Sequence, residues 1–543
     1  MSDLHRPGEP EYLGDTPSTP TERGGRKWPL LGIAAAGVVG VVGLGGWAAM
    51  SLMGGGSQPA EAVPANAIGF VSLDLDPSAA QKIEAVQILR KFPAIEKDLK
   101  VSSQDDLRRW VFEEMQKDGV CEDLDYAADV EPWIGDRLAV AGVPAERAGG
   151  DPTPLVALQV TDAEAAKAGI ARLAECGEAG ADFGVAISGD YALVSDSQAH
   201  ADALAASVAE GTLADDADFQ KWTERVGDPG ILTMYAAPGA LDHLVDMQAA
   251  MPDELSGMPG SPMNPMFPQP DRAAMDKQLE QMAEDFKGMA GVIRFEDGAV
   301  EAEFAGESTP EDLMTPDDRA GVTELPESTA LALGVSLREG WAQQYVDLLG
   351  QMMGAGGSVD QMLAQAEAMT GLELPEDIER LFGDGFALAV DRDLDVAAAS
   401  QDPAAVPAGI RVSGDPAEIK AVVAKIKAAI GPQADVLVVE EGDGVVAFGL
   451  AADYVRELAG EGALGDQATF QDVVPEADNA GALLFLDFDA VEQWVAQGME
   501  QSGQAGPTER RIQENIAPLR ALGLSASVDD DGSERALLRL STD

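Results

Sequence analysis

The feature that most restricts the fold of this chain is a set of short segments that recur in the same order about 250 residues later. Asp129–Asp136 (DVEPWIGD) resembles Asp377–Asp384 (DIERLFGD), and Leu213–Gln220 (LADDADFQ) resembles Leu464–Gln471 (LGDQATFQ). Between these two pairs, a Gly-Asp step before an apolar run also recurs. One such recurrence could arise by chance, but three in the same order predict two copies of one structural unit.

Each predicted copy mixes strands with helices. Ile68–Leu75 and Leu483–Phe488 are apolar runs typical of strands that are half or fully buried. Asp76 and Asp415 are each followed by proline, and this pair predicts an N-cap and the first helical residue. The sequence therefore predicts an α+β fold: two homologous copies of a sheet-plus-helices unit, with a mixed or largely antiparallel sheet.

Each copy is predicted to end in a β-hairpin. An Asp-Gly pair stands between the two strands of each hairpin, and its glycine accepts the positive φ of a tight turn. In the first hairpin, Val300, Ala302 and Phe304 alternate with Glu301 and Glu303. This period of two predicts one buried apolar face and one solvated acidic face.

An uncharged span, Trp28–Met53, precedes the copies and is long enough to cross the ~30 Å hydrocarbon layer as a helix. Arg23, Arg26 and Lys27 precede the span, and the next basic residue is Lys82. The positive-inside rule then predicts a cytoplasmic N-terminus and an extracytoplasmic C-terminal portion, anchored in the cell membrane by one helix. A cleaved signal peptide is the alternative, but its apolar core would be only about 7–15 residues long.

These features divide the chain into six parts. They are a cytoplasmic tail (1–27), a transmembrane helix (28–53), a stalk (54–62), a first extracytoplasmic repeat (63–307), a polar linker (308–325) and a second repeat (326–543). The formal net charge of −59 disfavours nucleic acid and anionic lipid headgroups as partners. It favours solubility outside the cytoplasm.

The chain has two cysteines, Cys121 and Cys176, and both fall in the first predicted repeat. An even number of cysteines in an oxidising compartment predicts a disulfide, with buried free thiols as the alternative. The repeat alignment places Met369 and Ala429 at the corresponding positions of the second copy, so the disulfide would be specific to the first copy.

No motif predicts a catalytic, metal-binding or cofactor-binding residue. Ser195-Asp196 with His200 lacks the surroundings of a nucleophile elbow, and the acidic run 391–402 lacks the glycine of a calcium loop. Met251–Pro270 offers thioethers of the kind that bind Cu(I), and the alternative there is a proline-rich insertion.

Val63–Asp98, together with Trp133–Asp136, resembles a family of single-pass membrane proteins of high-GC Gram-positive bacteria that is catalogued as a domain of unknown function. The resemblance covers most of residues 28–543. It implies the same layout of short tail, single membrane helix and long acidic exterior, and it implies no activity and no functional residues.

Three functions remain open. The favoured hypothesis is a non-enzymatic envelope protein that binds an unknown protein or ligand. The second is a module that holds an apolar or lipidic ligand between the two repeats, because duplicated units often meet at a cleft. The third is a hydrolase that uses carboxylates alone.

Overall fold

The computed structural model describes residues 57–75, 78–92, 107–117, 121, 123–145, 150–175, 183–243, 283, 285–307, 313–353, 359–502, 513–529 and 531–543. Among these residues, none of the helices combines the length and the apolar character that a membrane crossing needs. The predicted span Trp28–Met53 and the segment Met251–Pro270 both lie outside the described residues, so the interpretations of these two segments stay predictions.

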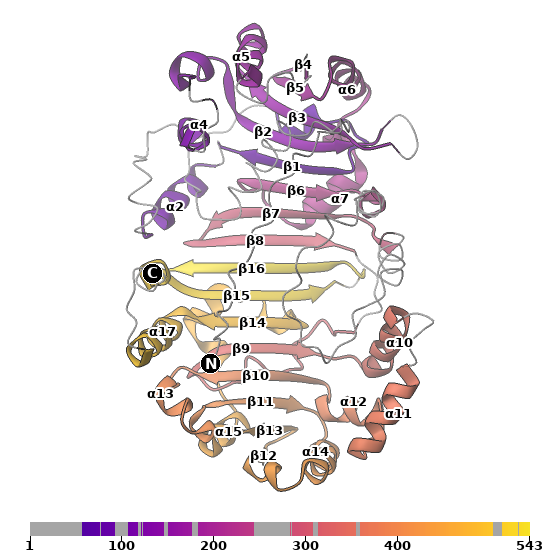
Figure 1. Ribbon diagram of the computed structural model, residues 1–543, viewed down its shortest axis with the longest axis vertical. Coiled ribbons are helices and arrows are strands. Elements are labelled where there is room, and N and C mark those ends of the chain that lie inside the picture. The colour runs from indigo at the N-terminus through magenta and orange to yellow at the C-terminus, as the bar shows by residue number, and fades with distance from the viewer. Residues whose placement is uncertain are drawn as a thin grey trace, which may run out of the picture.

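One antiparallel sheet of sixteen strands runs through the described chain (Figure 1). Its first eight strands are β1 Gly69–Asp74, β2 Ile134–Val143, β3 Thr153–Val160, β4 Gly184–Ser188, β5 Tyr191–Ser195, β6 Leu232–Ala236, β7 Met289–Glu296 and β8 Ala299–Gly306. The other eight are β9 Thr329–Ser336, β10 Gly385–Asp391, β11 Ala408–Ser413, β12 Val438–Glu441, β13 Val445–Gly449, β14 Ala482–Asp487, β15 Leu519–Val528 and β16 Glu534–Thr542. The predicted α+β class with an antiparallel sheet is confirmed.

The order of the strands is the same in the two halves of the sheet when each half is followed outward from the centre. The first half (described residues 57–307) runs β8-β7-β6-β1-β2-β3-β5-β4, and the second half (described residues 313–543) runs β16-β15-β14-β9-β10-β11-β13-β12. The halves meet where β8 pairs antiparallel with β16, with Ala302 opposite Leu538. The central pair is therefore the junction of two equally connected halves.

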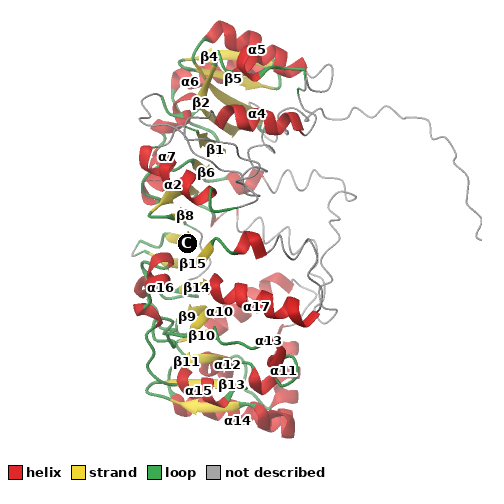
Figure 2. Ribbon diagram, turned by 90° about the vertical axis from the view of Figure 1, so that its left-hand side faces the viewer, coloured by secondary structure: helices red, strands yellow, loops and turns green. Residues whose placement is uncertain are grey.

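Helices lie on both faces of the sheet (Figure 2). Those of the first half are η1 Pro59–Ala62, α2 Ala79–Leu89, α4 Leu107–Lys117, η2 Tyr126–Val130, α5 Ala163–Glu175, α6 Gln198–Glu210, η3 Leu213–Asp215 and α7 Ala217–Arg225. Those of the second half are α10 Trp341–Met353, α11 Val359–Thr370, α12 Glu376–Phe382, α13 Val396–Ala399, η5 Pro403–Ala405, α14 Pro416–Ile430, η6 Gly431–Val436, α15 Ala452–Leu458, η7 Leu464–Asp466, α16 Ala468–Val473, η8 Ala477–Asn479 and α17 Phe488–Ser502. We call the two sides the α7 face and the α2 face, after the helices that cover them in the first half.

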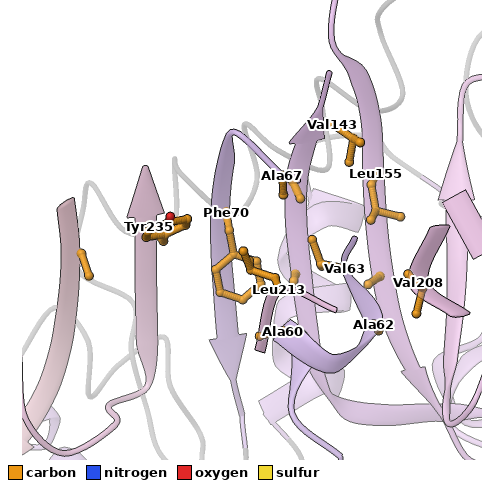
Figure 3. Close-up of a cluster of buried hydrophobic side chains, with 14 of the residues drawn as sticks. Ala60, Ala62, Val63, Ala67, Phe70, Val143, Leu155, Val208, Leu213 and Tyr235 are labelled. Carbon is orange, nitrogen blue, oxygen red and sulfur yellow. The ribbon is translucent and has the colours of Figure 1, made fainter. Parts of the chain in front are cut away.

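The α7 face carries the main core of the first half (Figure 3). Phe70 of β1 and Tyr235 of β6 pack there with Leu213 of η3 and with the fully buried Trp222 of α7. The corresponding core of the second half includes Leu325, Leu458, Leu464, Phe470 and Phe485. Each half therefore has its own core, and the sheet is continuous between them.

The α2 face carries a continuous row of apolar residues, because each strand contributes one to the same cross-strand register. The row consists of Ile187, Ala192, Leu158, Leu138, Leu73, Leu232, Ile293, Ala302, Leu538, Leu524, Leu484, Leu333, Leu388, Ile410, Phe448 and Val439. Cross-strand apolar pairs of this kind stabilise a sheet and require cover from water. In the first half α2 provides part of this cover.

The two predicted helix starts have different outcomes. The Asp415 side chain accepts hydrogen bonds from the backbone N–H groups of Ala417 and Glu418, and α14 begins at Pro416, as predicted. The cap of α2 is Ser78, whose hydroxyl accepts from Gln81 N, so the prediction of an Asp76 cap is wrong. A serine hydroxyl is as good a cap as a carboxylate, and Ser78 stands directly before the helix.

Some described residues of the predicted stalk and linker belong to the cores. Ala60 and Ala62 of the stalk pack in the core of the first half, and Val322 and Leu325 of the linker pack in the core of the second. Small apolar residues between polar ones and prolines gave no periodic pattern from which this burial could be recognised.

Candidate functional site

The junction strands place acids of the first half opposite arginines of the second half. On the α7 face, Glu303 of β8 pairs with Arg535 of β16, with 2.7 Å between Oε1 and Nη2. Glu301 pairs with Arg539, with 2.9 Å between Oε2 and Nη1. Both carboxylates are almost fully buried. The two halves are thus joined by ion pairs as well as by the β8–β16 backbone ladder.

Arg294 of β7 completes this buried network. Its guanidinium pairs with both Glu301 and Glu303 and also donates to the carbonyl oxygen of Val226 at 2.7 Å. Burial by itself would lower the pKa of Arg294, but the hydrogen bonds and charges of Glu303 and Glu301 outweigh burial and raise the pKa above its ordinary value. These carboxylates are therefore held by guanidinium groups on two sides.

The prediction that Glu301 and Glu303 form a solvated face is wrong. The alternation along β8 is as predicted, but the acids point to the covered face, and Val300, Ala302 and Phe304 are only half-buried. The reason is that two of the three partner arginines lie on β16, more than 200 residues later in the chain. A local pattern shows that two faces differ, and only the tertiary contacts decide which one is covered.

On the α7 face the junction has two corners, one on either side of the β8–β16 pair. At the first corner, Arg225 at the end of α7 reaches the β15–β16 turn of the other half. It pairs with Asp531 and Asp529 and donates to the Ser533 hydroxyl, with 3.4 Å between Arg225 Nη1 and Asp529 Oδ2. These bonds hold the pKa of Asp531 below its ordinary value. We call this the closed corner.

At the second corner, the end of α16 faces the β7–β8 turn. Two adjacent clefts of about 310 Å³ and 200 Å³ lie between them. The residues that line one or both clefts include Glu296, Asp297, Arg520, Arg539, Asp472, Pro475 and Glu476. We call this the open corner.

The two corners differ in the charge of the helix that faces the turn. The alignment that pairs Leu213 with Leu464 also pairs Lys221 with Asp472 and Arg225 with Glu476. In the closed corner a basic helix end meets an acidic turn. In the open corner an acidic helix end meets an acidic turn, with Arg535 and Arg539 between them, and the charge of Glu476 helps to raise the pKa of Arg535.

A third cavity, of about 260 Å³, lies at the hairpin end of β15 and β16, mainly on the α2 face. Most of its wall is apolar and comes from both halves: Phe286, Met289, Phe304, Ala305, Met314, Ala526, Val528 and Ala536. Glu307, Glu534 and Arg535 supply charge at its border. We call this the apolar pocket.

In the first half, a helix covers the hairpin end of β7 and β8 on the α2 face. Helix α2 fills that place, with Ala85 and Ile88 packed against Phe295 and against Ile293 and Val300. In the second half, α10 packs instead beside α12, with the Trp341 and Phe382 rings 6.1 Å apart. The apolar pocket thus occupies the place that a helix fills in the other half.

The residues singled out in the sequence do not come together as a site. The Ser195 hydroxyl donates to the Pro154 carbonyl at 2.7 Å and lies 3.5 Å from Asp196 Oδ1. The His200 ring pairs with the same Asp196 carboxylate on the surface and not with Ser195. Within the described ranges, no group of three or more histidine, cysteine or acidic residues is arranged to hold a metal ion.

Cys121 is buried and disulfide-bonded, and its Sγ lies 3.8 Å from the carbonyl oxygen of Leu173 near the end of α5. Helix α5 ends at Glu175, directly before Cys176 in the sequence. Cys176 itself lies outside the described residues, so the pairing of the two cysteines stays a prediction.

A family model described as "Protein of unknown function (DUF3352)" matches residues 31–406. No curated protein and no solved structure matches the chain.

Proposed function

The chain belongs to the DUF3352 family of proteins of unknown function, and we propose that this member is a non-enzymatic binding protein that holds an apolar or lipidic ligand at the junction of its halves. In this proposal Trp28–Met53 anchors the chain in a bacterial cell membrane and both halves lie outside the cytoplasm. The single observation that carries the proposal is the apolar pocket, which both halves line and which no described helix fills.

The chemistry of the pocket favours an acyl chain. Phe286, Met289 and Met314 are flexible or flat apolar side chains that adapt to an alkyl chain, and Ala526 and Ala536 leave room beside them. Each methylene transferred from water to such a wall contributes about 0.8 kcal/mol. The charged residues at the border suit the polar end of the same molecule.

The position of the anchor supports a membrane lipid as the source of the ligand. The described chain starts at Ser57, only a few residues after the predicted span Trp28–Met53. Since an extended residue covers at most about 3.6 Å, the first half would stay close to the bilayer surface.

We also propose that the two halves are copies of one unit. The common strand order supports this, and so do equivalent bonds. Asp129 accepts a hydrogen bond from the backbone N–H four residues earlier and pairs with Arg172 of α5. Asp377 accepts one from the same relative position and pairs with Lys425 of α14 at 2.7 Å. Helices α5 and α14 have the same place in the connectivity.

A second equivalence lies in the recurring segments that first indicated the duplication. The Gln220 side chain donates to the Ala214 carbonyl at 2.8 Å, and the Gln471 side chain donates to the Gly465 carbonyl at 2.8 Å. The recurring glutamines thus close the same turn before α7 and before α16, which is a structural reason for the recurrence.

A non-catalytic role is supported by the state of the buried junction acids. Glu301 and Glu303 are the acids most enclosed at the junction, and each is bonded to two arginines. A carboxylate held in this way is occupied by its partners and is poorly placed to exchange a proton with a substrate.

Native mass spectrometry of the full chain released from detergent tests the proposal. We expect wild-type protein to retain one acyl-chain adduct after mild delipidation, and Ala526→Phe to lower its occupancy by roughly tenfold because the ring fills the pocket. Ala364→Phe, at an exposed site on α11, adds the same ring elsewhere and should retain the adduct. Equal occupancy in the two variants, or no adduct on wild-type protein, would exclude the pocket as the site.

A further inference from the structure

We propose that the acyl chain of the ligand continues beyond the apolar pocket along the α2 face of the sheet, over Leu538, Leu524 and Leu484 to Leu333. This inference rests on the proposed function and deepens it, because it makes the ligand a long-chain lipid rather than a short-chain one.

The strand register makes this row of leucines continuous with the wall of the pocket. Ala526 of β15 lines the pocket, and Leu524 is the next residue of β15 on the same face. Leu524 lies opposite Leu538 of β16 on one side and opposite Leu484 of β14 on the other. Leu484 in turn lies opposite Leu333 of β9. An alkyl chain that leaves the pocket along this face therefore meets one leucine on each strand.

Leu333, at the end of the row, is unusually exposed for its place in the fold. It lies in the interior of the sheet, between β14 and β10, and is 39% exposed. On the other face of the same strand, the adjacent Ala332 is fully buried in the core of the second half. Leu538, Leu524 and Leu484 are half-buried. Contiguous accessible apolar surface of this kind marks a binding surface more often than an ordinary exterior.

The same row is covered in the first half of the sheet. Leu232 of β6 and Leu73 of β1 are 1% and 7% exposed there, and Leu232 packs in one cluster with Ala85 and Ile88 of α2. In the second half, α17 and α10 lie toward opposite ends of β14 and β9 (Figure 1), and Leu333 in the middle of β9 is accessible. The row is thus built in both halves and left accessible in one.

The chemistry of the row favours an alkyl chain as its occupant. The side chains are aliphatic, and β9, β14 and β15 are each paired with a neighbouring strand on both sides. The row therefore offers burial of apolar surface but no hydrogen bond. An extended peptide laid across it would lose water from polar groups that find no partner there, whereas an alkyl chain has no such groups.

The length of the row sets the length of the chain. Three steps between neighbouring strands separate Leu538 from Leu333, which is ~14 Å at ~4.8 Å a step. An extended alkyl chain advances by somewhat less than one C–C bond of about 1.5 Å for each carbon, so about ten carbons are needed beyond those inside the pocket. We therefore expect a palmitoyl chain to reach Leu333 and an octanoyl chain to end at the pocket.

Native mass spectrometry of the delipidated full chain tests the inference, with octanoyl-glycerol and palmitoyl-glycerol offered together in one detergent as neutral probes that share a headgroup. The readout is the ratio of palmitoyl to octanoyl adducts, because the partition of each probe into the detergent is the same for every variant. We expect Leu333→Glu to lower this ratio by about tenfold, since a charge at this position excludes the far end of the longer chain, and to retain the octanoyl adduct.

Two further variants serve as controls. Met362→Glu replaces an exposed apolar residue on α11 rather than on the sheet, and it should leave the ratio unchanged. Ala526→Phe should lower both adducts, because both chains occupy the pocket.

The outcomes separate this inference from the proposed function. An unchanged ratio in Leu333→Glu with the octanoyl adduct retained would overturn the inference alone. So would a wild-type dimer that Leu333→Glu converts to a monomer, which would assign the row to a second copy of the chain. Absence of both adducts on wild-type protein would overturn the proposed function as well. If Leu333→Glu loses both adducts, Leu333→Thr decides by the same ratio, because threonine shortens the apolar side chain and suits a strand.

Discussion

The closed and open corners are built by the same elements of the two halves, yet one is filled and the other is not. A short helix, α7 or α16, faces a hairpin turn of the opposite half in each case. Arg225 fills the closed corner, and Glu476 leaves the open corner with an excess of acids. Residues that the sequence alignment pairs therefore carry opposite charges in a corner that is filled and in a corner that holds a cleft.

The buried network of Glu301, Glu303 and Arg294, which we call the floor of the two corners, differs from both corners because its charges are buried and paired. Glu301, Glu303 and Arg294 are almost inaccessible to water. A buried ion pair adds little net stability over apolar packing, but removal of one partner leaves the other charged and unpaired. We therefore expect charge substitutions in the buried network, in the closed corner and at the turn of the open corner to change the stability of the chain by very different amounts.

The largest expected effect is that of Glu303→Ala, which breaks the shared floor. Arg294 and Arg535 would both lose a carboxylate, and we expect a loss of about 3–5 kcal/mol in the free energy of unfolding. Thermal denaturation of the full chain measures it. Glu307→Ala, which removes a half-exposed pair with Lys221 just beyond β8, should cost at most about 1 kcal/mol. Similar melting temperatures for the two variants would mean that the burial of an ion pair does not determine how much its removal destabilises the chain.

A smaller effect is expected when the closed corner is made to resemble the open one. Arg225→Glu removes charge-assisted hydrogen bonds to Asp531 and Ser533, and it should lower the melting temperature by less than Glu303→Ala does. The matched control is Arg456→Glu, since Arg456 is exposed and its ion pair within the described residues is with Asp453 on the same helix. If both variants melt alike, the closed corner contributes no more than an ordinary surface pair.

The smallest effect should come from Glu84→Gln. Glu84 belongs to α2 and bonds to the backbone of Gly298 in the β7–β8 turn, so the pH dependence of this variant reports on the charges at the turn beside the open corner. Burial raises the folded-state pKa of Glu84 above 4.5, so the contribution of this one group to stability is full below pH 4.5 and is lost as pH rises through its folded-state pKa. We expect the variant to melt at a higher temperature than wild-type protein at pH 7 and the difference to vanish below pH 4.5. The control is Glu113→Gln, at an exposed position of α4, and identical pH profiles for the two variants would contradict the prediction.

Much of the fold follows from local signals. The Asp-Gly hairpins and the cap of α14 occur where the sequence predicts them, because turns and caps depend on a few adjacent residues. The candidate sites were less predictable. The sequence shows the charge reversal between Arg225 and Glu476, but nothing in it indicates that either residue faces the opposite half. The apolar pocket has no local signal at all, since its wall combines residues from distant strands.

The sequence by itself determined the class of fold, the hairpins and the recurring segments, for these depend on the period of apolar residues and on turn chemistry. Only the tertiary structure decided that the acidic side of β8 is buried, that β8 pairs with β16, and that one corner is filled while its counterpart is open. The physical reason is that a strand carries its pattern locally, whereas the solvation of a charge depends on what the rest of the chain brings to it.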